Sequence, residues 1–295
     1  MKRLISRIAL FLVLMTFVYA ITTQVFSRLE QHAQGESQRL SYIHNRLVAD
    51  SIIMGSSRAL HHYNPQLLGN YYNVGEDRMG ILFNYGRLLL LRERHMPKKI
   101  IYDVEPDYDL LDQGDNDSYL GPLRPYYHRP GIQAIFWDVD FTERIKMLFP
   151  FYPYNGRLMK LLADNTHPLM SYTKGYSPYE GCEAIVPEKL PQDKLDPLKL
   201  EYLKKLIRLC QASHTELIFA ASPQLSYQSD SVYQVFQAIC QQERIPFFNH
   251  FCDTAYTHHR AYFHNANHLN RIGSNIYTKE IRKEIRKEIN NKKRK

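Results

Sequence analysis

The chain has 295 residues, 44% of them hydrophobic, which is enough for one large domain or two small ones and excludes a largely disordered chain. Much of the formal net charge of +8 lies at the two ends. In residues 279–295, acidic and basic side chains alternate at three- and four-residue spacing, which favours a solvated helix and does not require nucleic acid as a partner. This run, which ends in the basic tail at 291–295, would be attracted to anionic lipid headgroups if it lay near a membrane.

An uncharged, apolar run, Ile8–Ser27, follows three basic residues near the N-terminus. Its length suits a membrane-spanning helix, and the basic flank predicts a cytoplasmic N-terminus with the rest of the chain outside, in the periplasm of a bacterial-type inner membrane. A signal peptide cleaved after Ala20 is the alternative, and it would yield a secreted protein. We expect residues 1–27 to form a cytoplasmic stub and anchor, and residues 28–46 a helical stalk.

Five short apolar runs predict buried strands between residues 47 and 290. They are Ser51–Met54, Asn70–Gly75, Lys98–Pro106, Thr215–Pro223 and Ile245–His250. Helical patterns alternate with them at 79–96, 197–213, 229–245 and 268–285. This alternation predicts a three-layer α/β fold, in which a five-stranded parallel sheet is flanked by helices.

Residues 107–196 interrupt the alternation and are rich in Tyr, Pro and Gly. We expect an insertion with two or three helices, among them 132–148 and 156–163, that either builds a substrate surface or serves as a structural lid. The acidic run from Asp103 to Asp117 does not have the spacing of a calcium loop, so we predict a solvated loop and no metal site. The four cysteines show no metal spacing and leave their disulfide pairing open.

Three polar segments follow predicted strands and would meet at the carboxyl edge of a parallel sheet, where such folds bind ligands. They are Gly55–Ala59, Asn73–Gly80 and Phe263–Gly273. In the first, a glycine that permits a tight turn precedes two serines, either of which can cap the following helix or be presented as a nucleophile. His61 and His62, one turn further on, are expected at the surface or at the edge of the core.

The order of these segments resembles the SGNH, or GDSL-type, hydrolase family, whose membrane-anchored branches include acyl-modifying proteins of bacterial cell envelopes. The motifs are the Gly-Ser-Ser turn, the glycine after the second strand, and Asn-His-Leu-Asn-Arg-Ile-Gly before the last helix. The resemblance spans residues 50–113 and 197–285. It implies that Ser57 is the nucleophile, that His268 is its general base, and that the amides of Ser57 and Gly75 form the oxyanion hole.

Two positions depart from the family pattern. Asn265 stands three residues before His268, where the family has aspartate, and an asparagine can orient the ring but offers no charge to stabilise the imidazolium. The family's third-block asparagine, an oxyanion donor, has no counterpart after the third strand. Other side chains are candidates to replace the lost groups. They are Asn73 and Arg58 as oxyanion donors, and Glu105 and Asp253 as the acid.

The resemblance implies a serine-dependent esterase or O-acyltransferase that acts outside the cytoplasm on acyl esters of a cell-envelope glycan or on a small ester. It implies no metal and no organic cofactor. The expected partners are the acylated substrate, the membrane through the N-terminal helix, and proteins of an envelope pathway. The alternative is a binding or assembly protein of such a pathway, which keeps the fold and has lost the acid of the triad.

Overall fold

The computed structural model describes residues 2–112, 118–149, 151–167, 171–184, 194–226 and 229–294. The chain divides into two compact units, which we call the N-terminal unit (residues 1–46 and 121–171) and the sheet unit (residues 47–120 and 172–295). The segment predicted as one insertion is therefore divided, because its middle belongs with the N-terminal helices and its two ends belong with the sheet. Asp115 and Asp117 of the acidic run, and Lys295 of the basic tail, lie outside the described residues.

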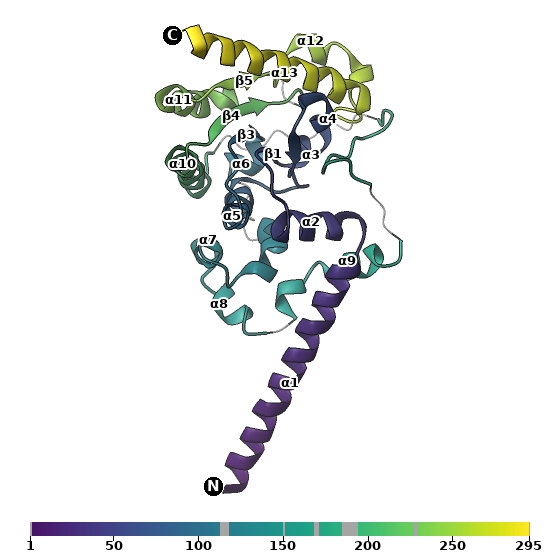
Figure 1. Ribbon diagram of the computed structural model, residues 1–295, viewed down its shortest axis with the longest axis vertical. Helices are drawn as coiled ribbons and strands as arrows, with labels where there is room; N and C mark the ends of the chain where they lie inside the picture. Colours follow the sequence, from purple (N-terminus) through teal and green to yellow (C-terminus); the bar gives the residue numbers. More distant parts are fainter. Residues whose placement is uncertain are drawn as a thin grey trace. The chain divides into compact units, whose positions relative to one another are not determined.

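The described part of the sheet unit contains a five-stranded parallel sheet, as the sequence predicts (Figure 1). Its strands are β1 (Ser51–Gly55), β2 (Tyr71–Asn73), β3 (Lys99–Asp103), β4 (Glu216–Ala221) and β5 (Phe247–Asn249). They follow the order β2-β1-β3-β4-β5, with Ser51 opposite both Tyr71 and Lys99. The order reverses between β1 and β3, and doubly wound sheets bind ligands at such a reversal.

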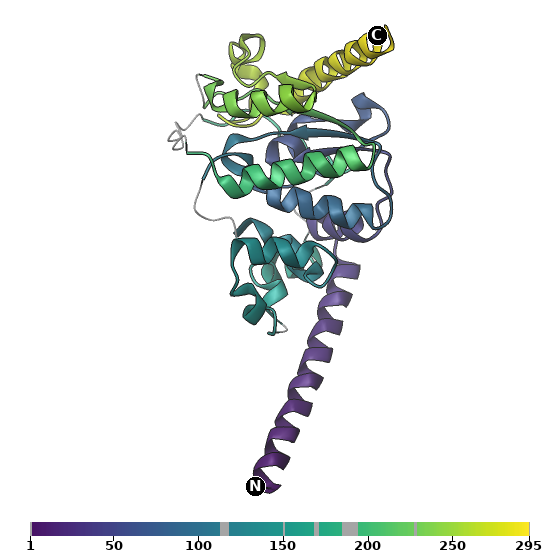
Figure 2. The ribbon, with the colours of Figure 1, turned by 90° about the vertical axis from the view of Figure 1, so that its left-hand side faces the viewer.

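Helices cover both faces of the sheet (Figure 2). On one face, α5 (Ile81–Arg92) packs against α10 (Pro197–Ala212), and Asn84 of α5 donates to the hydroxyl of Tyr102 in β3 at 3.2 Å. The preceding residue of β3, Ile101, points to the opposite face because successive side chains of a strand alternate. That face is covered by α3 (Ser57–His62), α4 (Pro65–Leu68) and α13 (Arg271–Arg294). The remaining described helices of this unit are α6 (Pro106–Asp109), η3 (Ser231–Tyr233), α11 (Gln234–Glu243), α12 (Thr254–Thr257) and η4 (Arg260–Tyr262).

The core beneath α13 follows from the spacing of its apolar residues. Tyr277, Ile281 and Ile285 recur every four residues, so they lie on one face of the helix and are buried. They pack against Ile53 of β1 and Ile101 of β3. The charged residues between them face outward, and the helix continues through residues 291–294 of the predicted basic tail.

The acidic residues after β3 are buried, so the prediction of a solvated loop is wrong. Asp103 and Asp109 are almost completely buried, and Glu105 is buried as well. Asp109 accepts hydrogen bonds from the hydroxyl of Tyr102 (2.8 Å) and from the backbone N–H of Glu105 (2.7 Å). Burial raises the pKa of Asp109 to about 7. These carboxyls therefore hold the loop to the sheet.

The N-terminal unit consists of helices. They are α1 (Lys2–His32), α2 (Gly35–Asn45), α7 (Ile132–Val139), α8 (Glu143–Lys146), η2 (Tyr152–Tyr154) and α9 (Leu158–Asp164), and η1 (Ser118–Tyr126) leads into it from the sheet unit. The single helix predicted at 132–148 is broken at Asp140, whose backbone is extended and whose carboxylate accepts from the N–H of Thr142 at 2.8 Å.

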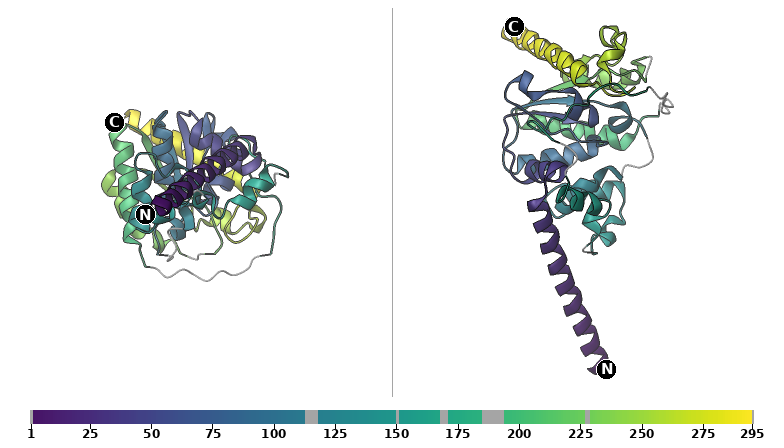
Figure 3. Two further views of the ribbon diagram at one scale, coloured as in Figure 1. Left: turned by 90° about the horizontal axis from the view of Figure 1, so that it is seen from below. Right: turned by 90° about the vertical axis from the view of Figure 1, so that its right-hand side faces the viewer.

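Helix α1 is uninterrupted (Figure 3) and is the one helix among the described residues that is long and apolar enough to cross a membrane. A signal sequence has the same properties. Near its C-terminal end, α1 buries Phe26 in a small core with Ala33 and Leu161 of α9. The end of α1 is therefore built into the fold of its unit.

Candidate active site

The two serines in the turn after β1 have different roles in the structure. Gly55 has a φ of +137°, and a Cβ at this position would lie 2.5 Å from the carbonyl oxygen of Asp103, so the turn requires glycine. Ser56 is the N-cap of α3, where its side chain accepts from the N–H of Arg58. Ser57 is thereby freed from capping and becomes the first residue of the helix, at the carboxyl edge of the sheet.

The structure brings Ser57, His268 and Asn265 together from opposite ends of the chain. His268 Nε2 lies 2.9 Å from Ser57 Oγ, and His268 Nδ1 lies 3.1 Å from Asn265 Oδ1. The same Oδ1 accepts from the backbone N–H groups of Asn267 and His268, each at 3.0 Å, which fixes the amide with its oxygen toward the ring. Nδ1 must therefore carry the proton, which leaves the lone pair of Nε2 facing the Ser57 hydroxyl. A general base needs this tautomer.

The environment of His268 keeps its ring neutral. Burial lowers the pKa of His268 to about 3, and the neighbouring His61 and Arg58 act in the same direction, while Asp77 opposes them. The oxygen behind the ring belongs to an amide and carries no charge to stabilise an imidazolium. The ring is consequently well oriented but weakly basic. A base whose pKa lies so far below neutral pH accepts a proton less effectively in the transition state.

His62 supports the position of His268. It is fully buried, its Nδ1 lies 2.8 Å from Ser222 Oγ, and its Nε2 accepts from the backbone N–H of Leu269 at 2.9 Å. It therefore ties α3 to the residue that follows His268. The expectation that His61 and His62 lie at the surface or the edge of the core is wrong, because both are fully buried where α3 meets other segments of the sheet unit.

An aromatic side chain from the predicted insertion borders the site. The ring of Tyr179 lies 4.0 Å from that of His61 and 5.1 Å from that of His268, and it stacks on His264 at 4.5 Å. His264 Nδ1 lies 3.0 Å from the carbonyl oxygen of Glu180, so this histidine is engaged away from the serine. Sequence reasoning missed Tyr179, since nothing but the general abundance of tyrosine distinguished it.

A second residue missed in the sequence is Asp77. Its carboxylate lies 3.0 Å from His61 Nε2, and the other ring nitrogen of His61 contacts the carbonyl oxygen of Ser177. Asp77 lies within the polar segment after β2 that the sequence did single out. His61 lies in the last turn of α3, the helix that follows the neighbouring strand β1, and this position brings its ring to Asp77. The pair joins the segments after β1 and β2 beside His268.

The two backbone N–H groups predicted for the oxyanion hole have different surroundings in the structure. The N–H of Gly75 donates to Asn73 Oδ1 at 2.9 Å and is therefore already engaged. Asn73 is not available as a substitute donor, because its amide group donates to the carbonyl oxygens of Ala59 (2.7 Å) and Tyr63 (3.1 Å). The N–H of Ser57, in the first turn of α3, has no partner within its own helix and is the predicted donor that stays available.

The other proposed substitutes are committed to other contacts. Arg58 is buried, bonds two backbone carbonyls, and has its Nε 3.7 Å from a carboxylate oxygen of Glu105. Glu105 accepts from the hydroxyl of Ser56, and burial raises its pKa to about 7. Asp253 caps α12 and lies 2.9 Å from His250. The structure thus supports none of the three in the roles suggested from the sequence.

Within the described ranges, no group of three or more His, Cys, Asp or Glu side chains could hold a metal ion. The structure forms no disulfide among the four cysteines, of which Cys210 and Cys240 are buried, Cys252 is half-buried and Cys182 is exposed.

No protein-family model and no curated protein matches the chain. Among solved structures, the chain is similar to a protein from Bacteroides fragilis NCTC 9343 described as a "putative acylhydrolase". The TM-score is 0.45 and the identity 12%, over 85% of this chain and 95% of the other. Because likeness at this level carries no argument about activity, the function rests on the geometry of the site.

Proposed function

We propose that the chain is a serine-dependent enzyme that acts on acyl esters, as an esterase or an O-acyltransferase. The observation that carries the proposal is the line of contacts from Ser57 Oγ to His268 Nε2 (2.9 Å) and from His268 Nδ1 to Asn265 Oδ1 (3.1 Å). A hydroxyl facing the lone pair of an oriented imidazole is the arrangement used to activate a serine.

In the proposed reaction, Ser57 Oγ attacks the acyl carbonyl carbon while its proton passes to His268 Nε2. The N–H of Ser57 donates to the oxyanion that forms. The carbon–oxygen bond of the ester then breaks, the alcohol leaves with the proton from His268, and the acyl group stays on Ser57. Water, or the hydroxyl of an acceptor, then attacks the acyl carbon while its proton passes to His268 Nε2. The bond between the acyl carbon and Ser57 Oγ breaks, and His268 returns the proton to Ser57 Oγ, which completes hydrolysis or transfer.

Two features predict slow turnover. In the best-studied serine protease, an asparagine in place of the triad aspartate costs on the order of 10⁴ in turnover. Loss of one oxyanion donor costs on the order of 10²–10³. Both conditions apply here, because an amide oxygen backs His268 and the N–H of Gly75 is engaged by Asn73.

We further propose an extracytoplasmic site of action, in the periplasm of a bacterial-type cell, on an acylated glycan of the envelope or a small ester, with envelope-pathway proteins as partners. The apolar α1 and its basic N-terminal flank support an anchored domain outside the cytoplasm, and cleavage after Ala20 would instead make it a secreted protein.

A fluorophosphonate probe on the full-length chain in detergent tests the nucleophile. The wild type should be labelled at Ser57, and Ser57→Ala should not be labelled. Ser56→Ala is the matched control and should keep the label, because the Ser56 hydroxyl faces Glu105 and the helix cap. An unlabelled wild type, or equal labelling of Ser57→Ala, would overturn the proposal.

The second candidate is a non-catalytic binding or assembly protein of an envelope pathway. The uncharged oxygen behind His268 and the engaged N–H of Gly75 favour it. It predicts that Ser57→Ala still complements a deletion of the gene, whereas the enzyme predicts that it does not. Under both the enzyme and the binding-protein hypothesis, substitution of Tyr179, which lies beside the site, should abolish complementation. Loss of complementation would show that the protein needs this surface for its function.

A further inference from the structure

Many large apolar side chains of the N-terminal unit are exposed, and they lie close together in the sequence. The exposed large apolar residues between α7 and the end of α9 are Phe141, Ile145, Leu148, Phe149, Phe151, Leu158, Met159 and Leu162. Leu148 and Met159 have 75% and 77% of their surface accessible. Single exposed apolar residues are ordinary on soluble proteins, but a cluster of this kind marks a surface that binds another apolar body.

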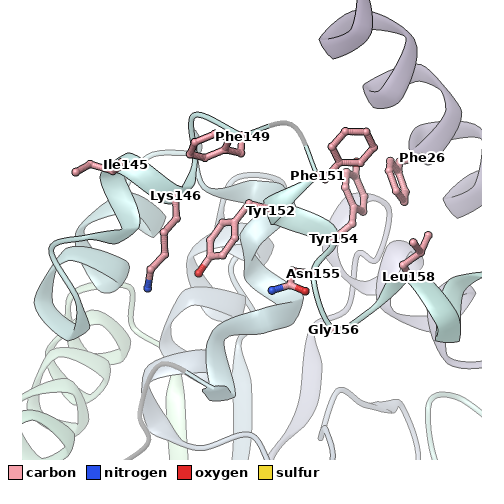
Figure 4. Close-up of a pocket in the computed structure, with 10 residues that line it drawn as sticks. All are labelled: Phe26, Ile145, Lys146, Phe149, Phe151, Tyr152, Tyr154, Asn155, Gly156 and Leu158. Atoms are coloured by element: carbon pink, nitrogen blue, oxygen red, sulfur yellow. The ribbon is translucent and has the colours of Figure 1, made fainter. Parts of the chain in front are cut away.

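Part of this surface is hollowed into a groove of about 440 Å³, which we call the aromatic groove (Figure 4). Its apolar lining consists of Phe26, Ile145, Phe149, Phe151, Tyr152, Tyr154 and Leu158. The ring of Phe26 stacks on that of Tyr154 at 3.9 Å and meets that of Phe151 edge-on at 6.4 Å. One wall of the aromatic groove is therefore α1 itself.

Continuity with α1 indicates what fills the aromatic groove. Phe26 lies at the end of the apolar run that is long enough to cross a membrane, and Ile21 and Val25 just before it are about half exposed. Side chains of a membrane-spanning helix that face away from its own protein are covered by lipid. Because Phe26 belongs both to α1 and to the lining of the aromatic groove, the groove adjoins this lipid-facing surface, and lipid can pass from one to the other.

The rim of the same surface has the chemistry of a membrane interface. The guanidinium of Arg144 lies 3.5 Å from the ring centre of Trp137, the chain's only tryptophan, and 4.3 Å from that of Phe141. Lys146, with its amine in ion pairs, borders the aromatic groove. Trp, Tyr and basic side chains with apolar stems are enriched at the level of lipid headgroups.

We propose that the exposed apolar surface between residues 141 and 162 docks on the bilayer leaflet at which α1 ends, and that the aromatic groove takes an acyl chain of a lipid from that leaflet. The unit then contacts the membrane in the interfacial zone as well as through α1, as amphipathic surface helices do. The inference concerns a surface apart from Ser57 and does not depend on the proposed reaction.

Tryptophan quenching by lipids brominated in their acyl chains tests the proposal. The full-length chain, with Trp137→Phe as background, is placed in phosphatidylcholine and phosphatidylglycerol vesicles. Phe149→Trp probes the aromatic groove, and Leu148→Trp probes the exposed surface beside it. Tyr42→Trp, on α2 of the same unit and 41% exposed, is the control.

We expect both probes to be quenched at least about twofold more strongly than the control, since interfacial residues lie within reach of the acyl region. Quenching at all three positions alike, or at none, would overturn the docking. Quenching of Leu148→Trp without Phe149→Trp would overturn the assignment of an acyl chain to the aromatic groove. A blue-shifted but unquenched Phe149→Trp would show that protein, rather than lipid, fills it.

Discussion

A single oxygen decides the chemistry of the candidate site. Asn265 Oδ1 accepts from two backbone N–H groups and from the ring of His268, as an aspartate oxygen could. The amide therefore reproduces the geometry of a triad acid without its negative charge. In most triads one aspartate both orients the histidine and stabilises its charged form. In this chain Asn265 orients His268 without stabilising the charged form.

Asn265→Asp should accelerate the reaction. The carboxylate keeps all three acceptor contacts, stabilises the imidazolium and raises the pKa of His268, so we expect Ser57 to react faster by about 10- to 10⁴-fold, the reverse of the known cost of losing this charge. The rate of fluorophosphonate labelling measures the change. Asn267→Asp adds the same charge nearby but contacts Ser226, and it should have a much smaller effect. An unchanged or lower rate in a folded Asn265→Asp variant would contradict the role assigned to Asn265.

The labelling rate of wild-type Ser57 should not change across the pH range in which the catalytic histidine of most serine hydrolases titrates. His268 is an effective base only above its pKa, which burial lowers from 6.5 to about 3. The labelling rate should therefore stay constant between about pH 5 and 8, and in Asn265→Asp its inflection should move to higher pH because a carboxylate favours the charged ring. A wild-type inflection between about pH 6 and 7 would show that His268 is more basic than its burial indicates.

Sequence patterns could predict the principal pair because each member is tied to a strand end. Ser57 follows the glycine that ends β1, and His268 precedes the last helix, so topology alone brings them to one edge of the sheet. The engagement of Gly75 could not be predicted, since it depends on the direction of the Asn73 side chain. Tyr179 reaches the site along a path through the insertion that has no periodic pattern.

Among the elements, α3 packs closely against the segment that follows β2. A Cβ on Gly75 would lie 2.6 Å from the backbone nitrogen of Leu60 and 2.8 Å from the Cβ of Ala59. The segment after β2 therefore packs directly on the helix that begins with Ser57. The glycine expected to supply an oxyanion donor thus serves first as a point of close packing.

Gly75→Ala should destabilise the sheet unit and displace α3. Overpacking of this kind costs about 1–3 kcal/mol in the free energy of unfolding, and Ser57 should also be labelled more slowly. Urea unfolding followed by circular dichroism measures the first effect. Gly121→Ala is the control, because a Cβ at that position would meet nothing within 4 Å and the variant should change stability by less than about 0.5 kcal/mol. Equal stability of the two variants would contradict the close packing.

The strands were predictable as elements, whereas the helices of the insertion were less so. Buried parallel strands are short, apolar and β-branched, and β1 and β3 carry this signal between clear turn residues. The pattern at 132–148 is helical throughout, but the side chain of Asp140 competes for the backbone N–H of Thr142 and ends α7. Hydrophobic periodicity does not depend on such local hydrogen bonds, so it could not predict where α7 ends.

At the scale of the whole molecule, long-range contacts define the N-terminal unit. The backbone N–H of Ser37 donates to the carboxylate of Asp164 at 2.9 Å, and the N–H of Gln34 donates to the carbonyl oxygen of the same residue at 2.9 Å. The segment at 28–46, expected as a helical stalk, is thus packed against the middle of the insertion. No local pattern could indicate this pairing, because the partners are more than one hundred residues apart.

The full-length chain should remain in the membrane fraction after alkaline carbonate washing. Leu10→Arg with Leu14→Arg places two charges in the centre of α1, at a cost of about 2.5–3.5 kcal/mol each, and should release the protein. Val235→Arg, on the exposed face of α11, should leave it in the membrane. A wild-type chain recovered in the soluble fraction and beginning at Ile21 would show instead that the segment is a cleaved signal.

The central claim is that the Ser57 hydroxyl, activated by His268, takes up an acyl group. It is tested most directly by incubating the full-length chain with p-nitrophenyl acetate, stopping the reaction with acid, and mapping the modified peptides by mass spectrometry. We predict an acetyl ester on Ser57 in the wild type, more of it in Asn265→Asp, and none in His268→Ala. A wild type without the adduct, or an adduct that forms equally well in His268→Ala, would contradict the claim.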